Sequence, residues 1–303
     1  MGKLEIIELA RQVARRTPTA SLVQGWRRRQ ARRLLLSSLR PSDVFIVGHP
    51  KSGNTWLSYM LAIAINGDED GRINLANLGE YVVPVHENDP SVAEHAQRGS
   101  PRLFRNERPL WPADLPRTIY LVRDPRAVLV SYYYHVLAEG GEYFSLDAFV
   151  DAYLYGSFFP RLQRWDVHVH GWLERAELQT VLFIRYEEML QDRASALDRS
   201  LRFVGVEPAV ENVDLALERG SFNAMRQAEC HHGVPAFSSP AVVHGRPTGN
   251  SSVCLESVAA VVEELYFIRR GEADSWRDEL SASSQRRIEE EFGPVMRRLG
   301  YLL

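Results

Sequence analysis

An α/β fold, with an open parallel sheet flanked by helices on both faces, is predicted by the order of apolar runs and helical segments along the chain. Three short apolar runs rich in β-branched residues have the composition of buried strands: 44–47, 118–122 and 180–184. Each run precedes a segment with helical periodicity, at 56–65, 125–137 and 187–204. Continuous apolar strands that alternate with helices are typical of a parallel sheet covered on both faces. Helical periodicity returns at 258–268 and 285–299.

The composition is that of a globular protein. Apolar residues make up 45% and charged residues 25% of the 303 residues, which excludes wholesale disorder, a collagen-like chain and a coiled coil. No run of about 18 apolar residues occurs, so no membrane-spanning helix is expected. The two cysteines, Cys230 and Cys254, are too few for a disulfide scaffold, and we expect a cytoplasmic protein. Cys230-His231-His232 lacks a matching pair at zinc spacing, so no metal is expected.

The first 42 residues differ from the rest in charge. They contain Lys3 and nine arginines against Glu5 and Glu8, which is a net charge of +8. We therefore divide the chain into a basic helical arm, residues 1–42, and a single domain, residues 43–303. Arg-rich helices poor in acidic residues are typical of peripheral membrane contacts, polyanion contacts and transit peptides. A solvated arm packed against an acidic body is the further alternative.

The loop after the first predicted strand has the strongest local signal: Gly-His-Pro-Lys-Ser-Gly-Asn-Thr-Trp. A glycine-containing turn between a strand and a helix presents backbone N–H groups and the positive end of the helix dipole, so it binds anions. The spacing Gly48-x4-Gly53 is that of a P-loop, but Asn54 occupies the position of the P-loop lysine. The lysine of this loop is Lys51. Among 36 basic residues the chain has one other lysine, Lys3.

Two further segments contain arginines placed to bind phosphate. Arg123 follows the second predicted strand, and Ser131 lies two helical turns further on. Ligands bind at the carboxyl ends of strands in open α/β sheets, and a guanidinium group is a planar donor suited to phosphate. Near the end of the chain Arg269 and Arg270 precede Gly271, an arrangement that can hold a second phosphate.

Taken in order, these segments resemble a sulfotransferase of the cytosolic type, whose donor is 3′-phosphoadenosine 5′-phosphosulfate (PAPS). Residues 50–56, Pro-Lys-Ser-Gly-Asn-Thr-Trp, are similar to the family's 5′-phosphosulfate loop, with Asn54 where threonine is commoner. Four more segments are similar to the family's 3′-phosphate segment, Tyr-Glu-Asp-Met motif, adenine-contacting helix and Arg-Lys-Gly loop, in that order: 123–133, 186–189, 221–225 and 267–276. The resemblance runs unbroken from about residue 43 to residue 276.

The resemblance implies a sheet of the P-loop type and a donor site with named residues. Lys51 and the amides that follow it would hold the phosphosulfate. Arg123, Ser131 and the arginine pair would hold the 3′-phosphate, and three aromatic side chains would contact adenine. The implied donor-binding residues besides Lys51 are Ser52, Gly53, Asn54, Thr55, Trp56, Arg123, Ser131, Tyr186, Phe222, Arg269, Arg270 and Gly271.

Sulfuryl transfer explains why a lysine stands in this loop. The SO₃ group passes in line from one oxygen to another, so the protein supplies positioning and charge stabilisation without a covalent intermediate. Negative charge builds on the bridging oxygen of the leaving nucleotide, and a cation that reaches this oxygen lowers the barrier. Lysine is a compact charge on a flexible stem. We predict Lys51 and Ser131 as catalytic residues, with adenosine 3′,5′-bisphosphate (PAP) as the product.

The base that receives the acceptor's proton is the sharpest departure from the family. The family has a histidine within a Lys-Thr-His-Leu-Pro segment, and here Arg105 takes the lysine position and Glu107 the histidine position. A carboxylate can act as base in a dry site, so we predict Glu107 as catalytic. The alternatives are His49 beside the loop and His86. A purely structural alternative is an ion pair of Glu107 with Arg105 or Arg108.

The acceptor is expected to be an organic hydroxyl compound, of small-molecule or lipid-like character. Its pocket would be formed by 67–99, 143–172 and 229–252, which are rich in aromatic residues or in Gly, Pro and Ser. No nucleic-acid partner is expected. The family's dimer motif is replaced at Ser281-Ala282, so the oligomeric state stays open. A non-catalytic nucleotide-binding protein and a P-loop kinase are the alternative functions.

Overall fold

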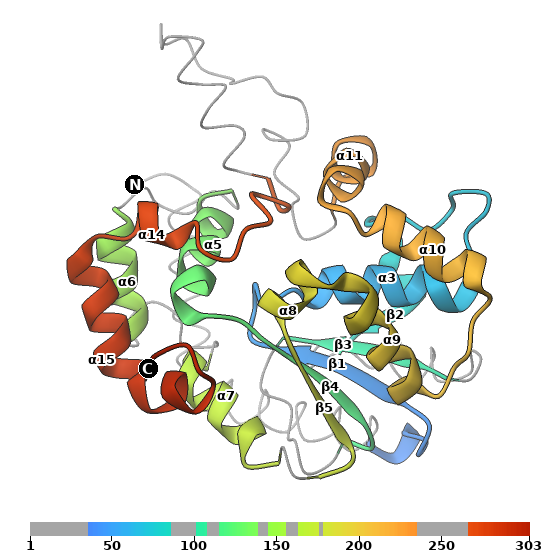
Figure 1. Ribbon diagram of the computed structural model, residues 1–303, viewed down its shortest axis with the longest axis horizontal. Helices are drawn as coiled ribbons and strands as arrows, with labels where there is room; N and C mark the ends of the chain where they lie inside the picture. The colour runs from blue at the N-terminus through green and yellow to red at the C-terminus, as the bar shows by residue number, and fades with distance from the viewer. Residues whose placement is uncertain are drawn as a thin grey trace, which may run out of the picture.

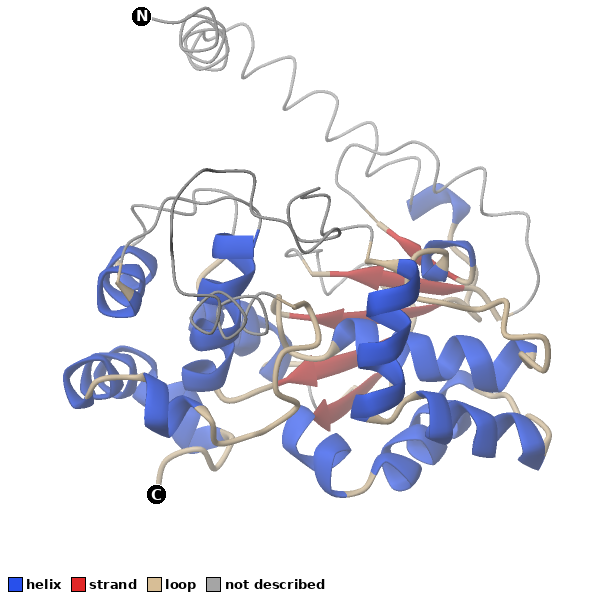
Figure 2. Cartoon of the chain, turned by 90° about the horizontal axis from the view of Figure 1, so that it is seen from above, coloured by secondary structure: helices blue, strands red, loops and turns tan. Residues whose placement is uncertain are grey.

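The computed structural model describes seven ranges of the chain: 36–85, 101–107, 115–138, 145–155, 163–175, 178–234 and 266–303. Within them, five parallel strands form one sheet in the order β2-β3-β1-β4-β5. They lie side by side in Figure 2. Their bounds are β1 Val44–Gly48, β2 Val82–Pro84, β3 Leu103–Asn106, β4 Thr118–Val122 and β5 Val181–Arg185. The predicted α/β class with an open parallel sheet is confirmed.

The central strands of the sheet are buried on both faces. Every residue of β1 and β4 is buried, as expected for continuous apolar strands between two helical layers. Side chains alternate between faces, so Val44 and Ile46 join one apolar cluster while Phe45 and Val47 join the other. Two apolar cores therefore hold the sheet between them.

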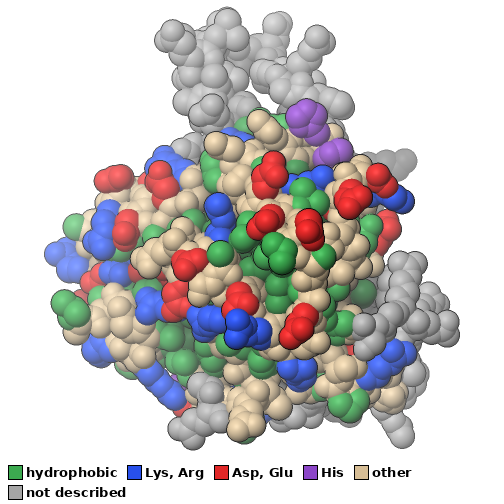
Figure 3. Space-filling view, turned by 45° about the vertical axis from the view of Figure 1, so that its right-hand side comes forward, with side chains coloured by type: hydrophobic (Ala, Val, Ile, Leu, Met, Phe, Trp, Pro, Cys, Tyr) green, Lys and Arg blue, Asp and Glu red, His purple; other side chains and the backbone are tan. Residues whose placement is uncertain are grey.

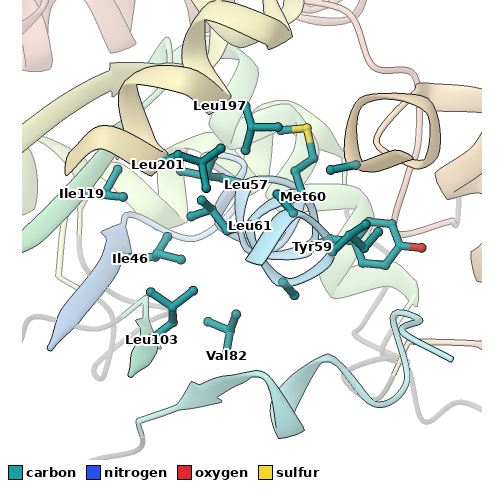
Figure 4. Packing of buried hydrophobic residues seen from close by; sticks show 14 of the residues in the cluster. Ile46, Leu57, Tyr59, Met60, Leu61, Val82, Leu103, Ile119, Leu197 and Leu201 are labelled. Atoms are coloured by element: carbon teal, nitrogen blue, oxygen red, sulfur yellow. The ribbon is translucent and has the colours of Figure 1, made fainter. Parts of the chain in front are cut away.

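Helices α3, α9 and α10 cover the first face (Figure 1). Their bounds are α3 Asn54–Asn66, α9 Arg193–Val204 and α10 Val210–Arg219. Figure 4 shows how α3 lies between the sheet and α9: Leu57 and Leu61 pack among Ile46, Ile119 and Leu201. Burying a leucine or isoleucine side chain stabilises the fold by about 1.5–3 kcal/mol, so this cluster fixes the start of α3 against the sheet.

Helices α5, α6, α7 and α15 cover the second face (Figure 1). Their bounds are α5 Pro125–Ala138, α6 Leu146–Leu154, α7 Trp165–Leu173 and α15 Ala282–Arg298. Trp165 and Phe292 lie fully buried at their contact, with ring centroids 5.6 Å apart. The carboxyl-terminal helix thereby becomes part of the same core as β1 and β4.

Two expected helices differ from the prediction. The segment 187–204 forms two helices, α8 Tyr186–Gln191 and α9, because Asp192 leaves the helical conformation and its carboxylate accepts a hydrogen bond from the Ser195 N–H at 2.9 Å. This is an N-cap that starts a new helix. Of the expected helix 258–268, residues 258–265 lie outside the described residues, and 266–268 form a bend.

The remaining elements are short or peripheral: the 3-10 helix η1 Leu78–Glu80, α11 Phe222–His232 and α14 Trp276–Glu279. Among the described helices, none has the length and hydropathy needed to cross a bilayer. On the face shown in Figure 3, acidic and basic side chains are interspersed with hydrophobic ones. This face therefore has no extended field of a single sign.

Candidate active site

Several of the residues that the sequence singled out lie at the carboxyl edge of the sheet. Because the strands are parallel, the residues that follow β1, β3, β4 and β5 all meet at this edge. They are the loop 49–53, Glu107, Arg123 and Tyr186. The topology thus unites segments that lie far apart in the sequence.

Lys51 occupies a conformation that favours glycine. Its φ is 70°, and it is the one non-glycine residue with positive φ in the described part of the chain. The left-handed conformation costs an L-residue about 1–2 kcal/mol, and such strain persists where the surroundings impose it, often at functional sites. Lys51 therefore carries a side chain at a position where the backbone conformation disfavours any residue other than glycine.

Two glycines shape the loop around Lys51. A Cβ added to Gly48 would lie 2.5 Å from Asn54 Oδ1 and 2.7 Å from the Leu121 carbonyl oxygen. Gly53 has a φ of 100°, and a Cβ there would lie 2.9 Å from the Tyr186 ring. The Asn54 side-chain amide donates to the Gly48 carbonyl at 3.2 Å. Asn54 therefore closes the loop from within, at the position where the family more commonly has threonine.

Arg123 supports the loop from the neighbouring strand. It donates through Nη1 to the Lys51 carbonyl at 3.1 Å and through Nη2 to the Glu272 carbonyl at 3.3 Å. Its guanidinium lies 4.0 Å from the centroid of the Tyr186 ring. The Lys51 Nζ lies 4.0 Å from the centroid of the Phe267 ring. The loop, β4 and the segment before α14 therefore converge on one place.

This place contains buried donors that an anion would satisfy. The Ser52 hydroxyl and the Arg123 Nε are buried and lack a hydrogen-bond partner within the described residues. Such buried polar atoms are rare, and a bound ion or water is one of the explanations for them. Both are donors, and they flank the backbone of a helix N-terminus. The residues present therefore fit a phosphosulfate or phosphate group.

The arginine pair near the end of the chain is positioned by a residue that sequence reasoning missed. Arg269 donates to both carboxylate oxygens of Glu279, on α14, at 3.1 and 2.9 Å, and Arg270 lies 3.5 Å from the same carboxylate. Gly271 has a φ of 65°, and a Cβ there would lie 2.5 Å from the Phe222 ring. Glu279 thus orients the arginines, while Gly271 leaves space for Phe222.

A second missed residue, Glu229 on α11, anchors the same segment. Its carboxylate accepts hydrogen bonds from the backbone N–H groups of Phe267 and Ile268 at 2.7 and 2.8 Å. Burial raises the pKa of Glu229. A glutamate inside an otherwise amphipathic helix gives no sequence signal for such a role, because its partners are backbone groups 38 and 39 residues away.

The aromatic residues assigned to adenine lie near one another. The Trp56 indole N–H donates to the Gly220 carbonyl at 2.8 Å, which places Trp56 beside the start of α11 where Phe222 stands. The Trp56 and Tyr186 rings meet edge to face with centroids 5.7 Å apart. Ser131 is partly buried on α5. The site therefore has an aromatic part next to its cationic part.

The proposed base region lies at the end of β3. Arg105 donates to the Thr55 hydroxyl at 2.9 Å, so it is directed to the start of α3. Glu107 is partly exposed just beyond the strand, and within the described residues it forms no ion pair with Arg105. Arg108 and His86, named with Glu107 as partner and alternative base, lie outside the described residues.

His49, the other alternative base, is fully buried. Its Nδ1 donates to the Pro50 carbonyl at 3.1 Å, and its Nε2 accepts from the Tyr153 hydroxyl at 2.8 Å. Burial lowers its pKa to about 4. The His168 ring lies 5.8 Å away and hydrogen bonds Tyr120 at 2.8 Å. Both ring nitrogens of His49 are thus engaged inside the protein.

Comparisons with known proteins show the family of this chain. The family model for the sulfotransferase domain matches residues 41–300. The chain is 27% identical over 265 residues to Sulfotransferase 2A1 of Homo sapiens, covering 81% of each chain, and 26% identical over 271 residues to Sulfotransferase 1 family member D1 of Rattus norvegicus, covering 84% of this chain and 83% of the relative.

Solved structures show the same fold. Mouse sulfotransferase SULT7A1 complexed with PAP matches with a TM-score of 0.62 and 23% identity, covering 88% of this chain and 89% of that one. Retinol dehydratase in complex with androsterone and PAP matches with a TM-score of 0.60 and 19% identity, covering 85% and 81%. The chain belongs to the sulfotransferase domain family. The predictions of the family, of the P-loop-type fold and of PAPS-dependent sulfuryl transfer are confirmed.

Proposed function

We propose that Lys51 drives sulfuryl transfer from PAPS to the hydroxyl of a small organic acceptor. The supporting observation is the left-handed conformation of Lys51, which favours glycine although a lysine is kept there. A mobile ammonium group at this point can follow the charge that develops on the bridging oxygen as the sulfuryl group leaves. In a site of low dielectric such a charge is effective because little water screens it.

The donor would be held by charge and by backbone N–H groups. Ser52, Gly53, Asn54, Thr55 and Trp56 form the loop and the first turn of α3, whose dipole favours an anion. The 3′-phosphate would be bound by the donors gathered around Arg123, together with Ser131 of α5 and the orienting pair Glu279 and Arg269. We propose the same donor-binding residues that the sequence indicated: Ser52, Gly53, Asn54, Thr55, Trp56, Arg123, Ser131, Tyr186, Phe222, Arg269, Arg270 and Gly271.

Glu107 is the proposed base. It follows β3 directly, next to the strand that carries the Lys51 loop. As the acceptor oxygen bonds to sulfur, its proton passes to the Glu107 carboxylate. Arg105 donates a hydrogen bond to the Thr55 hydroxyl, so its positive charge lies on the donor side of the site. Ser131, also named as catalytic, would act by fixing the donor.

The acceptor class is a small molecule with a nucleophilic oxygen. One relative, 24% identical over 272 residues, is an amine sulfotransferase of Oryctolagus cuniculus, so amines also belong in an acceptor screen. We further propose a cytoplasmic location and the division into an arm, 1–42, and one domain, 43–303. Contact of the arm with a membrane surface stays a prediction, because residues 1–35 lie outside the described residues.

The experiment follows labelled sulfate from PAPS to a panel of phenols, alcohols and amines. Lys51→Ala should lower kcat by about 10²–10³-fold. Glu107→Gln should lower it by about 10²-fold or more while the affinity for PAP, measured by calorimetry, stays unchanged. Lys3→Ala and the exposed Glu207→Gln are matched controls. Full activity of Glu107→Gln would overturn the base assignment, and absence of transfer by the unmodified chain would overturn the proposed function.

A further inference from the structure

A histidine that the sequence did not single out contacts the same aromatic ring as Lys51. His135 lies on α5, four residues after Ser131. Residues four apart share one face of a helix, so His135 and Ser131 lie on the same face of α5. Ser131 is a proposed donor-contacting residue, so His135 lies one helical turn beyond the proposed donor site.

Phe267 connects His135 with Lys51. The Lys51 Nζ lies 4.0 Å from the centroid of the Phe267 ring. The His135 ring meets the same ring edge to face, with centroids 6.4 Å apart and an interplanar angle of 75°. The Tyr132 ring stacks on His135 from its own helix, at 5.9 Å and 23°. Three segments of the chain, the β1–α3 loop, α5 and the residues before α14, meet at this point.

The electrostatic environment keeps this imidazole neutral. Burial lowers the pKa of His135 to about 3, and the charge of Lys51 acts in the same direction. The other described residues in ring contact with it, Tyr132 and Phe267, are uncharged at neutral pH. A neutral imidazole has a lone pair and can accept a proton. A bound donor brings negative charge next to Lys51, which offsets the lysine and raises the pKa of His135.

The chemistry of the transfer calls for a proton acceptor here. The acceptor oxygen forms a bond to sulfur, the bond from sulfur to the bridging oxygen breaks, and its electron pair stays on the phosphate beside Lys51. The hydroxyl proton has to leave as these bonds change. The His135 imidazole and the Lys51 ammonium contact the same Phe267 ring, so a base stands on the side of the site where Lys51 would stabilise the leaving group.

We propose that His135 is a second proton acceptor of the transfer site, which takes the hydroxyl proton in parallel with Glu107. This inference rests on the proposed function, since it assigns a residue to that same reaction. The imidazolium formed in the step then releases its proton to solvent. The two groups belong to different strands: Glu107 follows β3 and His135 lies on the helix after β4, and β3 and β4 flank β1 on opposite sides.

The first test compares kcat, the acceptor KM and the affinity for PAP among variants. His135→Gln keeps a polar side chain, His135→Phe keeps an aromatic ring against Phe267, and His170→Gln alters a largely exposed histidine as the control. Both His135 variants should lower kcat by about 10-fold or more with unchanged PAP affinity. The double variant with Glu107→Gln should lose more activity than either single variant. Full kcat in both His135 variants would overturn the proposal.

The second test measures the protonation state of the His135 imidazole directly and does not depend on enzymatic turnover. Protein with ¹⁵N-labelled histidine is titrated from pH 7.5 down to the lowest pH at which it stays folded, with and without PAP, and His135→Gln assigns the signal. The His135 signal should stay neutral in the free protein and should protonate at a higher pH when PAP is bound. A signal that PAP leaves unchanged would overturn the proposal, even where Lys51→Ala confirms the transfer reaction. If the chain transfers no sulfate, the proposed function fails, while this signal still reports on His135.

Discussion

The two sides of the transfer site differ in how closely they follow the family. On the donor side, the loop around Lys51 matches the family pattern, and its one departure, Asn54, makes a hydrogen bond that closes the loop. On the acceptor side, we propose Glu107 at the position of the family histidine, and a partly buried histidine, His135, lies on α5.

This difference has a physical origin. The donor site has to cradle fixed anions, which demands defined backbone conformations, glycines at close contacts and cations at fixed points. Proton acceptance is less demanding, because any basic atom within hydrogen-bond reach of the hydroxyl and with a suitable pKa can serve. The donor side is therefore constrained residue by residue, while the acceptor side admits several solutions.

The largest expected effect separates catalysis from stability at Lys51. Lys51→Gly removes the ammonium and should lower kcat by about 10²–10³-fold. The same change relieves a left-handed conformation that costs about 1–2 kcal/mol, partly offset by the lost Phe267 contact, worth roughly 0.5–1 kcal/mol. The free energy of unfolding should therefore rise by about 1 kcal/mol.

Lys51→Ala is the matched variant for that comparison. It removes the ammonium but keeps a Cβ at a φ of 70°. Both variants should lose the same activity, and denaturant unfolding should find Lys51→Gly the more stable of the two. Equal stabilities would show that the conformation at residue 51 is unstrained, and retained activity in either variant would remove the lysine from the mechanism.

The next effect concerns pH and tests whether His49 packs the core or takes part in the chemistry. Its pKa is about 4 in the folded protein against an ordinary 6.5. The folded state therefore favours the neutral imidazole. The contribution of His49 to the free energy of unfolding is fully present above pH 6.5, and it is lost as the pH falls toward 4, because the unfolded chain then binds a proton that the folded protein does not. Between pH 6.5 and pH 5 the loss from His49 is about 2 kcal/mol.

Urea unfolding of the wild type and of His49→Gln at several pH values measures this contribution. The variant should lose less stability on acidification, by about 2 kcal/mol over that interval. At neutral pH the kcat of His49→Gln should equal that of the wild type, provided that the two proteins bind the donor equally well. An identical pH dependence of stability in the two proteins would contradict the burial argument, and a selective loss of kcat would return His49 to the list of bases.

The sequence predicted the parts of the molecule that are local in the chain. β1, β4 and the helices after them follow from apolar runs of strand length and from helical periodicity, and β4 was placed at its observed bounds. β2 and β3 gave no such signal, because one is three residues long with Pro84 and the other contains Arg105. The break at Asp192 was missed because the apolar periodicity continues across it.

The same distinction holds for the site. Lys51, Arg123 and Gly271 could be named because a motif or a strand end marked each of them. Glu229 and Glu279 could not be named, since they act on backbone groups or arginines brought near only by the fold. His135 was hidden in a helix where a single histidine has no distinctive pattern. Its position became informative only when α5 was placed against Lys51.

The smallest expected effect tests whether the donor-side departure is conservative. Asn54→Thr restores the residue that the family more commonly has and removes the 3.2 Å hydrogen bond to the Gly48 carbonyl. Such a bond contributes about 1 kcal/mol, so the variant should be destabilised by roughly that amount, while kcat changes by less than the effect of Glu107→Gln. Asn54→Ala removes the bond and restores nothing, so its stability, measured beside that of Asn54→Thr, isolates the bond itself. If Asn54→Thr lowers kcat as strongly as Glu107→Gln does, the donor side is as altered as the acceptor side, and the contrast between them disappears. If kcat is unchanged while the free energy of unfolding falls, Asn54 stabilises the loop without taking part in the reaction. The difference between this chain and the family then lies in the group that accepts the proton.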